Sequence, residues 1–162
     1  MELVTIKGNY SEALRHKVFG VVRDIVGVTG QPAYVIGGFV RDLLLGIPSQ
    51  DIDIVVQGSG IDLATSVSRR FTGSHLSVFK SFGTAMVKAG GAEIEFVGAR
   101  KESYRADSRK PIVEDGTIED DQRRRDFTIN ALALSLNPDT FGDIVDPFGG
   151  IEDLRDGIIR TP

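Results

Sequence analysis

The segment SQDIDIVVQ, residues 49–57, places two acidic side chains inside an apolar stretch. Ile52, Ile54 and the two valines that follow are typical of a buried β-strand. Successive side chains of a strand point to opposite faces, so Asp51 and Asp53 would share one face, roughly 7 Å apart. Two carboxylates at that distance repel each other. A fold that contains this strand must therefore place the acidic face in solvent or beside a positive charge.

A divalent cation is an economical partner for these carboxylates. Magnesium takes hard oxygen ligands and is usually held by one or two carboxylates plus substrate phosphates. A second acidic stretch, AEIEFVGAR, alternates Glu93 and Glu95 with apolar residues. If the two strands pair, one of these glutamates could complete a three-carboxylate cluster. The alternative is a solvated edge strand, which is the commoner meaning of an isolated Asp-x-Asp pattern.

Composition excludes several classes of protein. The 162 residues are 41% hydrophobic, which is enough for one packed domain. No apolar run approaches 18 residues and the N-terminus does not resemble a secretory signal, so we expect no membrane span and a cytoplasmic location. There is no cysteine, and His16 and His75 are the only imidazoles, which argues against a zinc hydrolase. The net charge of −4 argues against gripping nucleic acid by bulk charge.

Hydrophobic spacing predicts a mixed α/β chain. A helix with Ser11 as its N-cap and a helix stopped by Gly46 are expected near the start. The expected elements, in chain order, are a helix at 11–26, a strand at 33–38, a helix at 39–46, a strand at 51–57, a helix at 61–71 and three strands within 75–99. Because the last three strands follow one another through glycine turns, the sheet cannot be all parallel.

The following segment, from Arg100 to about Gln122, shows no apolar periodicity. Fifteen of the 26 residues from Lys101 to Asp126 are charged. Loops of this length are uncommon in compact domains and are usually functional or disordered. We therefore expect a long loop here, with residues from about Lys101 to Glu119 the least ordered of the chain.

A basic run and a predicted helix follow in RRRDFTINALALSL. Apolar residues stand at helical spacing, and Asn130 would lie one turn after Asp126 on the polar face. The apolar residues are Phe127, Ala131 and Leu134. Guanidinium groups of the three arginines would suit phosphates and ribose hydroxyls. By itself, however, the run EDDQRRR favours a solvated acidic-basic stretch held by local ion pairs.

The motif VIGGFVRD contains a glycine pair at a strand-to-helix turn. Gly37 and Gly38 would let the backbone approach a ligand closely. The helix that follows would present free N–H groups to an anion such as a phosphate, and Arg41 in its first turn could reach the same anion. A lone glycine pair is more often only a turn.

Taken together, these motifs resemble the catalytic head domain of bacterial tRNA nucleotidyltransferases, the CCA-adding enzymes, and of the similar bacterial poly(A) polymerases. The matching stretches are AYVIGGFVRDLLLGIPSQDIDIVV, FGTAMV, EIEFVGAR, RRRDFTINALAL and IVDPFGGIEDLRDGIIRTP. The resemblance covers about Ala33 to Pro162. It implies an α/β (α+β) fold of the polymerase-β nucleotidyltransferase type, a small mixed sheet with helices packed on it.

The resemblance also implies roles for particular residues. Asp51, Asp53 and Glu95 match the catalytic, metal-binding carboxylates, with Mg²⁺ as cofactor. The implied nucleotide-binding residues are Gly37, Gly38, Arg41, Arg125, Asp126 and Asn130. The implied reaction is two-metal transfer of CMP or AMP from CTP or ATP to the 3′ end of tRNA or another RNA.

The resemblance divides the chain into a leading helical segment at 1–30, the head domain at 31–148 and the start of a linker to an absent neck domain at 149–162. In that family the neck reads the incoming base, so this chain does not distinguish CCA addition from A-only or poly(A) addition. A non-catalytic module that binds magnesium and nucleotide is the alternative. The sequence does not indicate an oligomeric state.

Overall fold

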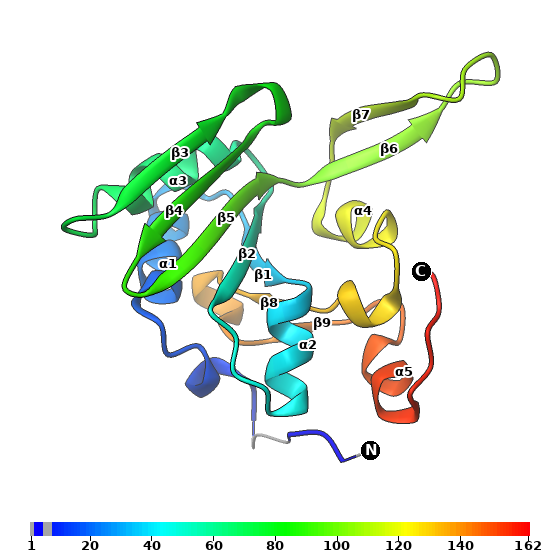
Figure 1. The fold of residues 1–162 in the computed structure, drawn as a ribbon, viewed down its shortest axis with the longest axis horizontal. Helices are drawn as coiled ribbons and strands as arrows, with labels where there is room; N and C mark the ends of the chain where they lie inside the picture. The colour runs from blue at the N-terminus through cyan, green and yellow to red at the C-terminus, as the bar shows by residue number, and fades with distance from the viewer. Residues whose placement is uncertain (1, 5–7) are drawn as a thin grey trace.

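The computed structural model describes residues 2–4 and 8–162. Its centre is a seven-stranded sheet in the order β3-β4-β5-β2-β1-β8-β9, and a two-stranded ribbon projects from one side (Figure 1). The strands are β1 (Ala33–Ile36), β2 (Asp51–Val56), β3 (His75–Phe79), β4 (Thr84–Ala89), β5 (Ala92–Gly98), β6 (Arg100–Tyr104), β7 (Pro111–Asp115), β8 (Ala133–Ser135) and β9 (Ile144–Val145).

Five α-helices and four 3-10 helices connect these strands in the described residues. The α-helices are α1 (Lys17–Thr29), α2 (Gly38–Leu45), α3 (Gly60–Ser68), α4 (Ile118–Arg123) and α5 (Gly150–Asp156). The 3-10 helices are η1 (Ser11–Ala13), η2 (Lys80–Phe82), η3 (Thr128–Asn130) and η4 (Pro138–Thr140). Helix α2 ends where the sequence predicts, with Gly46 at φ +73°. Across residues 2–4 and 8–162, no helix combines the length and apolar character that crossing a bilayer requires.

The sheet is mixed, which confirms the predicted fold class. Strands β2 and β5 pair in parallel, and the other pairings within the sheet are antiparallel. A parallel pair needs a long crossover. Here the chain leaves β2 through α3 and the β3–β4 hairpin before it returns as β5.

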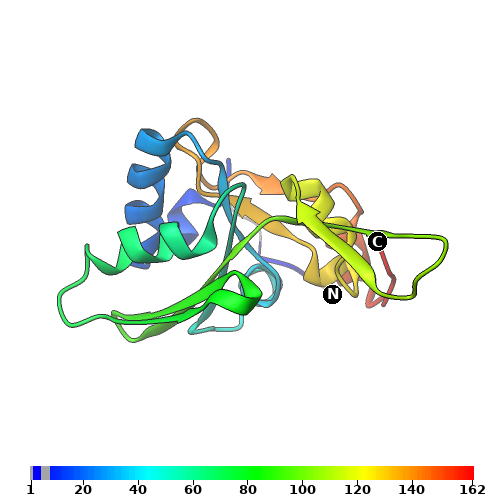
Figure 2. The same ribbon diagram turned by 90° about the horizontal axis from the view of Figure 1, so that it is seen from above.

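The main core lies on one face of the sheet, under α1 and α3 (Figure 2). Alternate residues of the two parallel strands point into it, and Ile52, Ile54, Ile94 and Phe96 are all almost fully buried. This alternation puts the intervening residues of β2 and β5 on the opposite face.

A smaller cluster covers part of that opposite face. Its buried members are Ile36, Val55, Ala99 and Ala133, and Ile118 at the start of α4 packs against them. Val55 shares its face with Asp51 and Asp53, four and two positions earlier. Helix α4 therefore covers the ends of the central strands and leaves their acidic beginnings uncovered.

The first predicted helix begins later than expected. Residues Ser11–Ala13 form the separate turn η1, and α1 starts at Lys17. His16, and not Ser11, is its N-cap, since His16 Nδ1 accepts the backbone N–H of Val18 at 3.1 Å. Contacts across the fold decide this: Tyr10 N donates to the carbonyl of Gly142 at 2.9 Å and fixes the segment before the helix.

The helix predicted from the spacing of Phe127, Ala131 and Leu134 is wrong. The segment forms the turn η3 and then the strand β8. Residues 131–136 are all buried, as expected for a strand covered on both faces. Hydrogen-bonded partners on both sides, β1 and β9, override the helical periodicity.

The long loop predicted between Arg100 and Gln122 is also wrong, because the segment forms the ribbon β6–β7 and helix α4. The ribbon places opposite charges across from each other, Arg100 opposite Asp115 and Lys101 opposite Glu114. The backbone pairing of β6 with β7 holds the ribbon, and such pairing requires no apolar periodicity. The lack of apolar periodicity in the sequence therefore did not exclude a strand pair.

The C-terminal segment is held against η3. Thr128 Oγ1 donates to Asp153 Oδ2 at 2.7 Å, and Thr128 N donates to the carbonyl of Arg160 at 2.8 Å. Arg160 also forms an ion pair with Asp153 at 3.4 Å. The division of the chain at residue 149 into head and linker stays a prediction.

The ribbon's mobility also stays a prediction, and it can be measured. Side chains of residues 101–110 are exposed, and a lone two-stranded ribbon is marginally stable in water. We expect the ribbon amides to exchange with deuterium within seconds, while the amides of β2 and β5 stay protected far longer in the same sample. Hydrogen exchange followed by mass spectrometry measures both, and ribbon protection equal to that of β5 would contradict the expectation.

Candidate active site

Strands β2 and β5 place their acidic residues beside one another on one face of the sheet. The parallel register sets Asp51 opposite Glu93 and Asp53 opposite Glu95. Partners in a sheet register point to the same face, and the main core lies on the other one. The three carboxylates of the predicted catalytic set therefore share one surface, with Glu93 as a fourth.

The environment of Asp53 differs from that of the other carboxylates. Asp53 is half-buried, whereas Asp51 and Glu95 are exposed. Burial raises the pKa of Asp53 above its ordinary value, and the negative charges of Glu95 and Asp51 raise it further, while Arg125 acts in the opposite direction. The arginine therefore compensates the carboxylates only in part, and the site has room for more positive charge.

The donor chemistry of this face fits a hard divalent cation. All the candidate ligands are carboxylate oxygens. A cation beside Asp53 would offset the burial and the negative charges that raise its pKa. Over residues 2–4 and 8–162, no three acidic, histidine or cysteine side chains gather closely enough to hold an ion. A magnesium ion that also binds substrate phosphates is usually held by only one or two carboxylates, so it does not require a closer cluster.

Gly37 brings the β1–α2 turn against the carboxylates. Its φ of +81° lies in the left-handed region that favours glycine. A Cβ at this position would lie 3.5 Å from Nη1 of Arg125 and 3.8 Å from Oδ2 of Asp53. The backbone of the turn, the guanidinium of Arg125 and the carboxylate of Asp53 therefore converge beside Gly37. Helix α2 starts at Gly38, and the first N–H groups of a helix have no intrahelical partners, which suits an anion.

A chain of hydrogen bonds joins Arg41, Asn130 and Asp126. Arg41 Nη1 donates to Asn130 Oδ1 at 2.7 Å, and Asn130 Nδ2 donates to Asp126 Oδ1 at 3.2 Å. The sequence places the last two on one helical face, whereas the structure joins them through the η3 turn. The Asn130 carbonyl lies 3.7 Å from the Cβ position of Gly37. The six residues predicted to bind nucleotide thus come from two segments that meet beside Asp53.

Asp121 is a site residue that the sequence analysis missed. Its side chain is fully buried. Its Oδ1 accepts hydrogen bonds from Nε and Nη2 of Arg125 at 3.3 and 3.1 Å. Its Oδ2 accepts the same two groups of Arg124 at 3.3 and 3.1 Å, and the backbone N–H of Arg100 at 3.1 Å. This carboxylate therefore fixes the guanidinium group that lies beside Gly37 and Asp53.

The sequence carried a signal for this arrangement. Asp121 stands three and four residues before Arg124 and Arg125, the spacing at which helical side chains meet. The local ion pairs were expected, but the expectation that they are solvated was wrong. The side chains of Arg124 and Arg125 are 24% and 20% exposed, and that of Asp121 is inaccessible. Burial came from α4 packing against the sheet, which the spacing alone does not reveal.

A cavity of about 230 Å³ opens beside the carboxylates, toward β4; we call it the carboxylate cavity. Its lining residues are Asp53, Thr84, Glu95, Val97, Arg100, Arg124 and Arg125. Acidic groups and three arginines thus face the same space. Such a lining suits a phosphate-bearing ligand accompanied by a cation.

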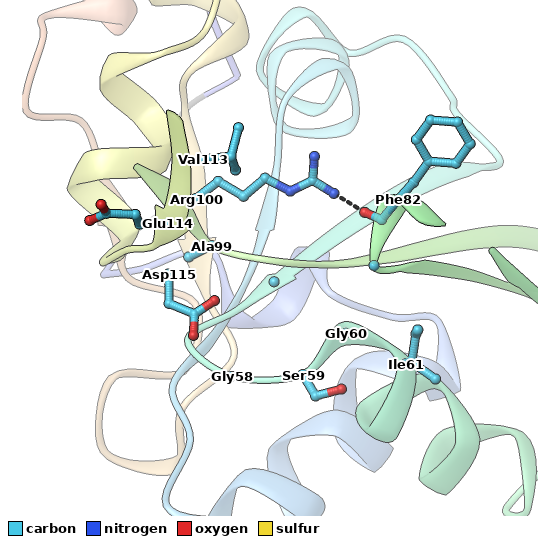
Figure 3. Close-up of a pocket in the computed structure, with 12 residues that line it drawn as sticks. Gly58, Ser59, Gly60, Ile61, Phe82, Ala99, Arg100, Val113, Glu114 and Asp115 are labelled. Carbon is cyan, nitrogen blue, oxygen red and sulfur yellow. Dashed lines mark hydrogen bonds between the residues drawn. The ribbon is translucent and has the colours of Figure 1, made fainter. Parts of the chain in front are cut away.

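A larger cavity, of about 550 Å³, lies between the start of α3 and the ribbon (Figure 3). Ser59 and Gly60 line one side of it, and Glu114 and Asp115 of β7 line the other. Arg100 extends across it and donates from Nη2 to the carbonyl of Phe82. None of the predicted catalytic carboxylates borders this cavity, so its size does not make it the reaction site.

A mixed sheet with two paired acidic strands, a glycine turn and two arginines held by the buried Asp121 defines a nucleotidyltransferase type of domain. The comparisons identify its family. Residues 33–160 match the model of the poly A polymerase head domain family. The chain belongs to this family. Among relatives, it is 46% identical over 129 residues to the A-adding tRNA nucleotidyltransferase of Aquifex aeolicus. The matched residues are 80% of this chain and 16% of that protein.

Other relatives agree. The CCA-adding enzyme of Geobacillus stearothermophilus is 37% identical over 134 residues, 82% of this chain and 31% of that protein. A solved apo structure of a CCA-adding enzyme matches 99% of this chain and 39% of its own, with 38% identity and a TM-score of 0.82. A tRNA nucleotidyltransferase solved with a primer tRNA and an incoming ATP analogue matches 86% of this chain and 38% of its own, with 41% identity and a TM-score of 0.74. The chain thus spans well under half the length of these proteins.

The raised pKa of Asp53 predicts a pH-dependent stability. Because folding raises this pKa, the ionised carboxylate destabilises the folded state, and this penalty is lost as the pH falls through the folded-state pKa toward the unfolded value of about 3.9. In EDTA at pH 7, Asp53→Asn should therefore have a higher free energy of unfolding than the native chain, and the difference should shrink at pH 3.5. Urea unfolding at both pH values measures this. Asp24→Asn, on the exposed side of α1, is the control and should show no such gain.

Removal of the Asp121 carboxylate, which accepts hydrogen bonds from Arg124 and Arg125, should lower the stability strongly. Asp121→Ala leaves two mostly buried guanidinium groups and a backbone N–H without their acceptor, and should cost about 3 kcal/mol of unfolding free energy. Glu119→Ala breaks the exposed ion pair with Arg123 on the same helix and should cost less than about 1 kcal/mol. Equal losses in urea unfolding for the two variants would contradict the role given to Asp121.

Proposed function

We propose that this chain is the catalytic head of a template-independent RNA nucleotidyltransferase, which transfers CMP or AMP from CTP or ATP to the 3′ end of tRNA. The observation that carries the proposal is the convergence of Asp53 and Arg125 on the Gly37 turn, where a Cβ would lie within 3.8 Å of both, on the sheet face that also bears Asp51 and Glu95. A cytoplasmic location, expected from the sequence, is part of the proposal.

Each residue has a role that follows from its position. The triphosphate binds at the Gly37–Gly38 turn, where backbone can approach closely and the start of α2 presents N–H groups. Arg41 lies in the first turn of the same helix. Arg125 is held by Asp121 through Nε and Nη2, which leaves Nη1, the nitrogen beside Gly37, to donate to phosphate oxygens.

The ribose contacts fall to Asp126 and Asn130. Their side chains hydrogen-bond each other beside the glycine turn and offer carboxylate and amide groups of the kind that pair with hydroxyls. These contacts, like those to the phosphates, are the same for every ribonucleotide. We therefore propose that base selection depends on residues outside this chain.

The relatives support the proposal that base selection depends on residues outside this chain. Similar proteins include A-adding, CC-adding and CCA-adding tRNA nucleotidyltransferases, which share this head despite the different nucleotides in their names. The choice of nucleotide therefore does not follow from the head. CTP and ATP are proposed here as a pair for that reason.

The reaction that the site supports is a displacement at the α-phosphorus. The 3′-hydroxyl oxygen of the RNA forms a bond to that phosphorus, the bond to the bridging oxygen of the β-phosphate breaks, pyrophosphate leaves and the hydroxyl proton is released. Carboxylates of the set Asp51, Asp53 and Glu95 would hold Mg²⁺ together with the substrate phosphates, and the ion, when bound, supplies charge stabilisation and lowers the pKa of a hydroxyl. Arg125 orients the nucleotide phosphates at the same place.

A comparison of two variants tests the proposal in a protein that carries this chain together with the further segments of its relatives. Asp53→Ala should reduce magnesium-dependent transfer of labelled AMP or CMP to tRNA by at least ~100-fold, because a metal-binding carboxylate is lost while the core stays intact. Arg125→Ala should mainly raise the KM for nucleotide. Circular dichroism shows whether each variant is folded.

Two outcomes would contradict the proposal. Near-native turnover by folded Asp53→Ala would refute the assignment of the catalytic carboxylates. A native protein that binds magnesium-nucleotide, but transfers none to any RNA, would favour the non-catalytic binding module instead. Asp24→Ala, an acidic position far from the sheet face, is the matched control and should retain full transfer.

A further inference from the structure

A second hollow lies next to the carboxylate cavity, between β6 of the ribbon and helix α4. It has a volume of about 540 Å³, and we call it the ribbon groove. Its lining residues are Lys101, Glu102, Tyr104, Asp120, Arg123 and Arg124. Figure 1 shows the ribbon β6–β7 extending outward from the sheet, past α4.

The ribbon groove adjoins the site of the proposed reaction. Arg124 lines both the ribbon groove and the carboxylate cavity. Arg100, the first residue of β6, also lines the carboxylate cavity, and Lys101 and Tyr104 of the same strand line the groove. Strand β6 thus contributes residues both to the carboxylate cavity and to the ribbon groove.

The two sides of Asp53 differ in their chemistry. In the sheet order β4-β5-β2-β1, the Gly37 turn lies on the β1 side of Asp53, and Arg41 and Asn130 are next to it. Thr84 of β4, which lines the carboxylate cavity, lies on the other side. In a phosphoryl-transfer displacement the attacking and leaving oxygens lie roughly in line. If the triphosphate occupies the β1 side, the attacking hydroxyl arrives from the β4–β5 side, where the ribbon begins.

The groove also has the composition that a single-stranded nucleic acid recognises. Tyr104 is 68% exposed and presents an aromatic ring, and Lys101 and Arg123 are exposed cations. Bases stack on such rings, and backbone phosphates pair with such cations. The exposed pair between Arg123 and Glu119 is of a kind that contributes little, so the arginine can exchange it for a phosphate.

The two acidic groups of the groove do not cancel this character. Asp120 accepts the backbone N–H of Thr117 at 2.9 Å and so serves to cap α4. Its hydrogen bond to that backbone, and to a smaller extent the nearby Lys101, lowers its pKa. Glu102 is the remaining carboxylate, against Lys101 and Arg123, since the guanidinium of Arg124 is bound by Asp121. The chain as a whole has a net charge of −4, so this concentration of cations is local.

We propose that the ribbon groove binds the single-stranded 3′ segment of the RNA acceptor and directs its terminal hydroxyl into the carboxylate cavity. Tyr104 stacks on a base, and Lys101 and Arg123 bind phosphates. This assignment rests on the proposed function, which makes RNA the acceptor. It adds the path by which the acceptor reaches Asp53 and the residues that hold it.

The test measures RNA binding separately from nucleotide binding. The 162-residue chain is titrated, in EDTA, into a fluorescein-labelled oligoribonucleotide of about eight nucleotides with a free 3′-hydroxyl, and anisotropy gives the affinity. Tyr104→Ala should bind about tenfold more weakly, and Tyr104→Phe should bind as the native chain does, because the ring is retained. Lys101→Ala and Arg123→Ala should each reduce the slope of log affinity against log salt by about 0.7.

Matched controls decide between the groove and general electrostatics. Arg69→Ala removes an exposed arginine at the end of α3, on the other side of the sheet, and should leave RNA affinity unchanged. Calorimetric affinity for magnesium-ATP should be the same in all these variants. Native-like RNA binding by Tyr104→Ala, Lys101→Ala and Arg123→Ala, or an equal loss in Arg69→Ala, would overturn the proposal. If the proposed function alone fails, the chain will show this same pattern of RNA affinities while the longer protein transfers no nucleotide.

Discussion

The parallel pairing of β2 with β5 is the constraint on which the rest of the site depends. It sets Asp53 opposite Glu95 and turns the carboxylates of both strands to one face, while the residues between them fill the main core. Packing on one face thus forces charge onto the other. Burial, and then that repulsion, raise the pKa of Asp53 above its ordinary value. Arg125, which Asp121 holds in place, supplies positive charge to this face.

Helix α4 has two structural roles that meet at the carboxylates. Ile118 packs on the second hydrophobic cluster and closes the far end of the acidic face. One turn later, Asp121 is buried against the same face and fixes Arg125 next to Asp53. The same carboxylate accepts the backbone N–H of Arg100, where the ribbon begins. The ribbon, helix α4 and Arg125 are therefore joined through one buried side chain, and Arg124, which the same carboxylate holds, lines the ribbon groove.

Local sequence patterns predicted the parts whose causes are local. The alternation of Asp51 and Asp53 with apolar residues predicted a one-sided acidic strand, and the glycine pair predicted a turn that approaches other groups closely. Patterns failed where partners distant in sequence decided the outcome. The helical spacing after Phe127 was overridden by hydrogen bonds from β1 and β9, and the charged segment after Arg100 became a ribbon through cross-strand pairing.

The sequence by itself therefore determined the fold class, the residues proposed to bind metal or nucleotide, and the family resemblance that the comparisons support. Only the tertiary structure decided which of these residues meet, and which of them are shielded from water. Asp121 shows the difference most clearly. In the sequence it belongs to an ordinary run of charges, and in the fold it is an inaccessible acceptor for two arginines. Spacing along a helix fixes which side chains can touch, but burial depends on what packs over them, and that contact comes from strands distant in the chain.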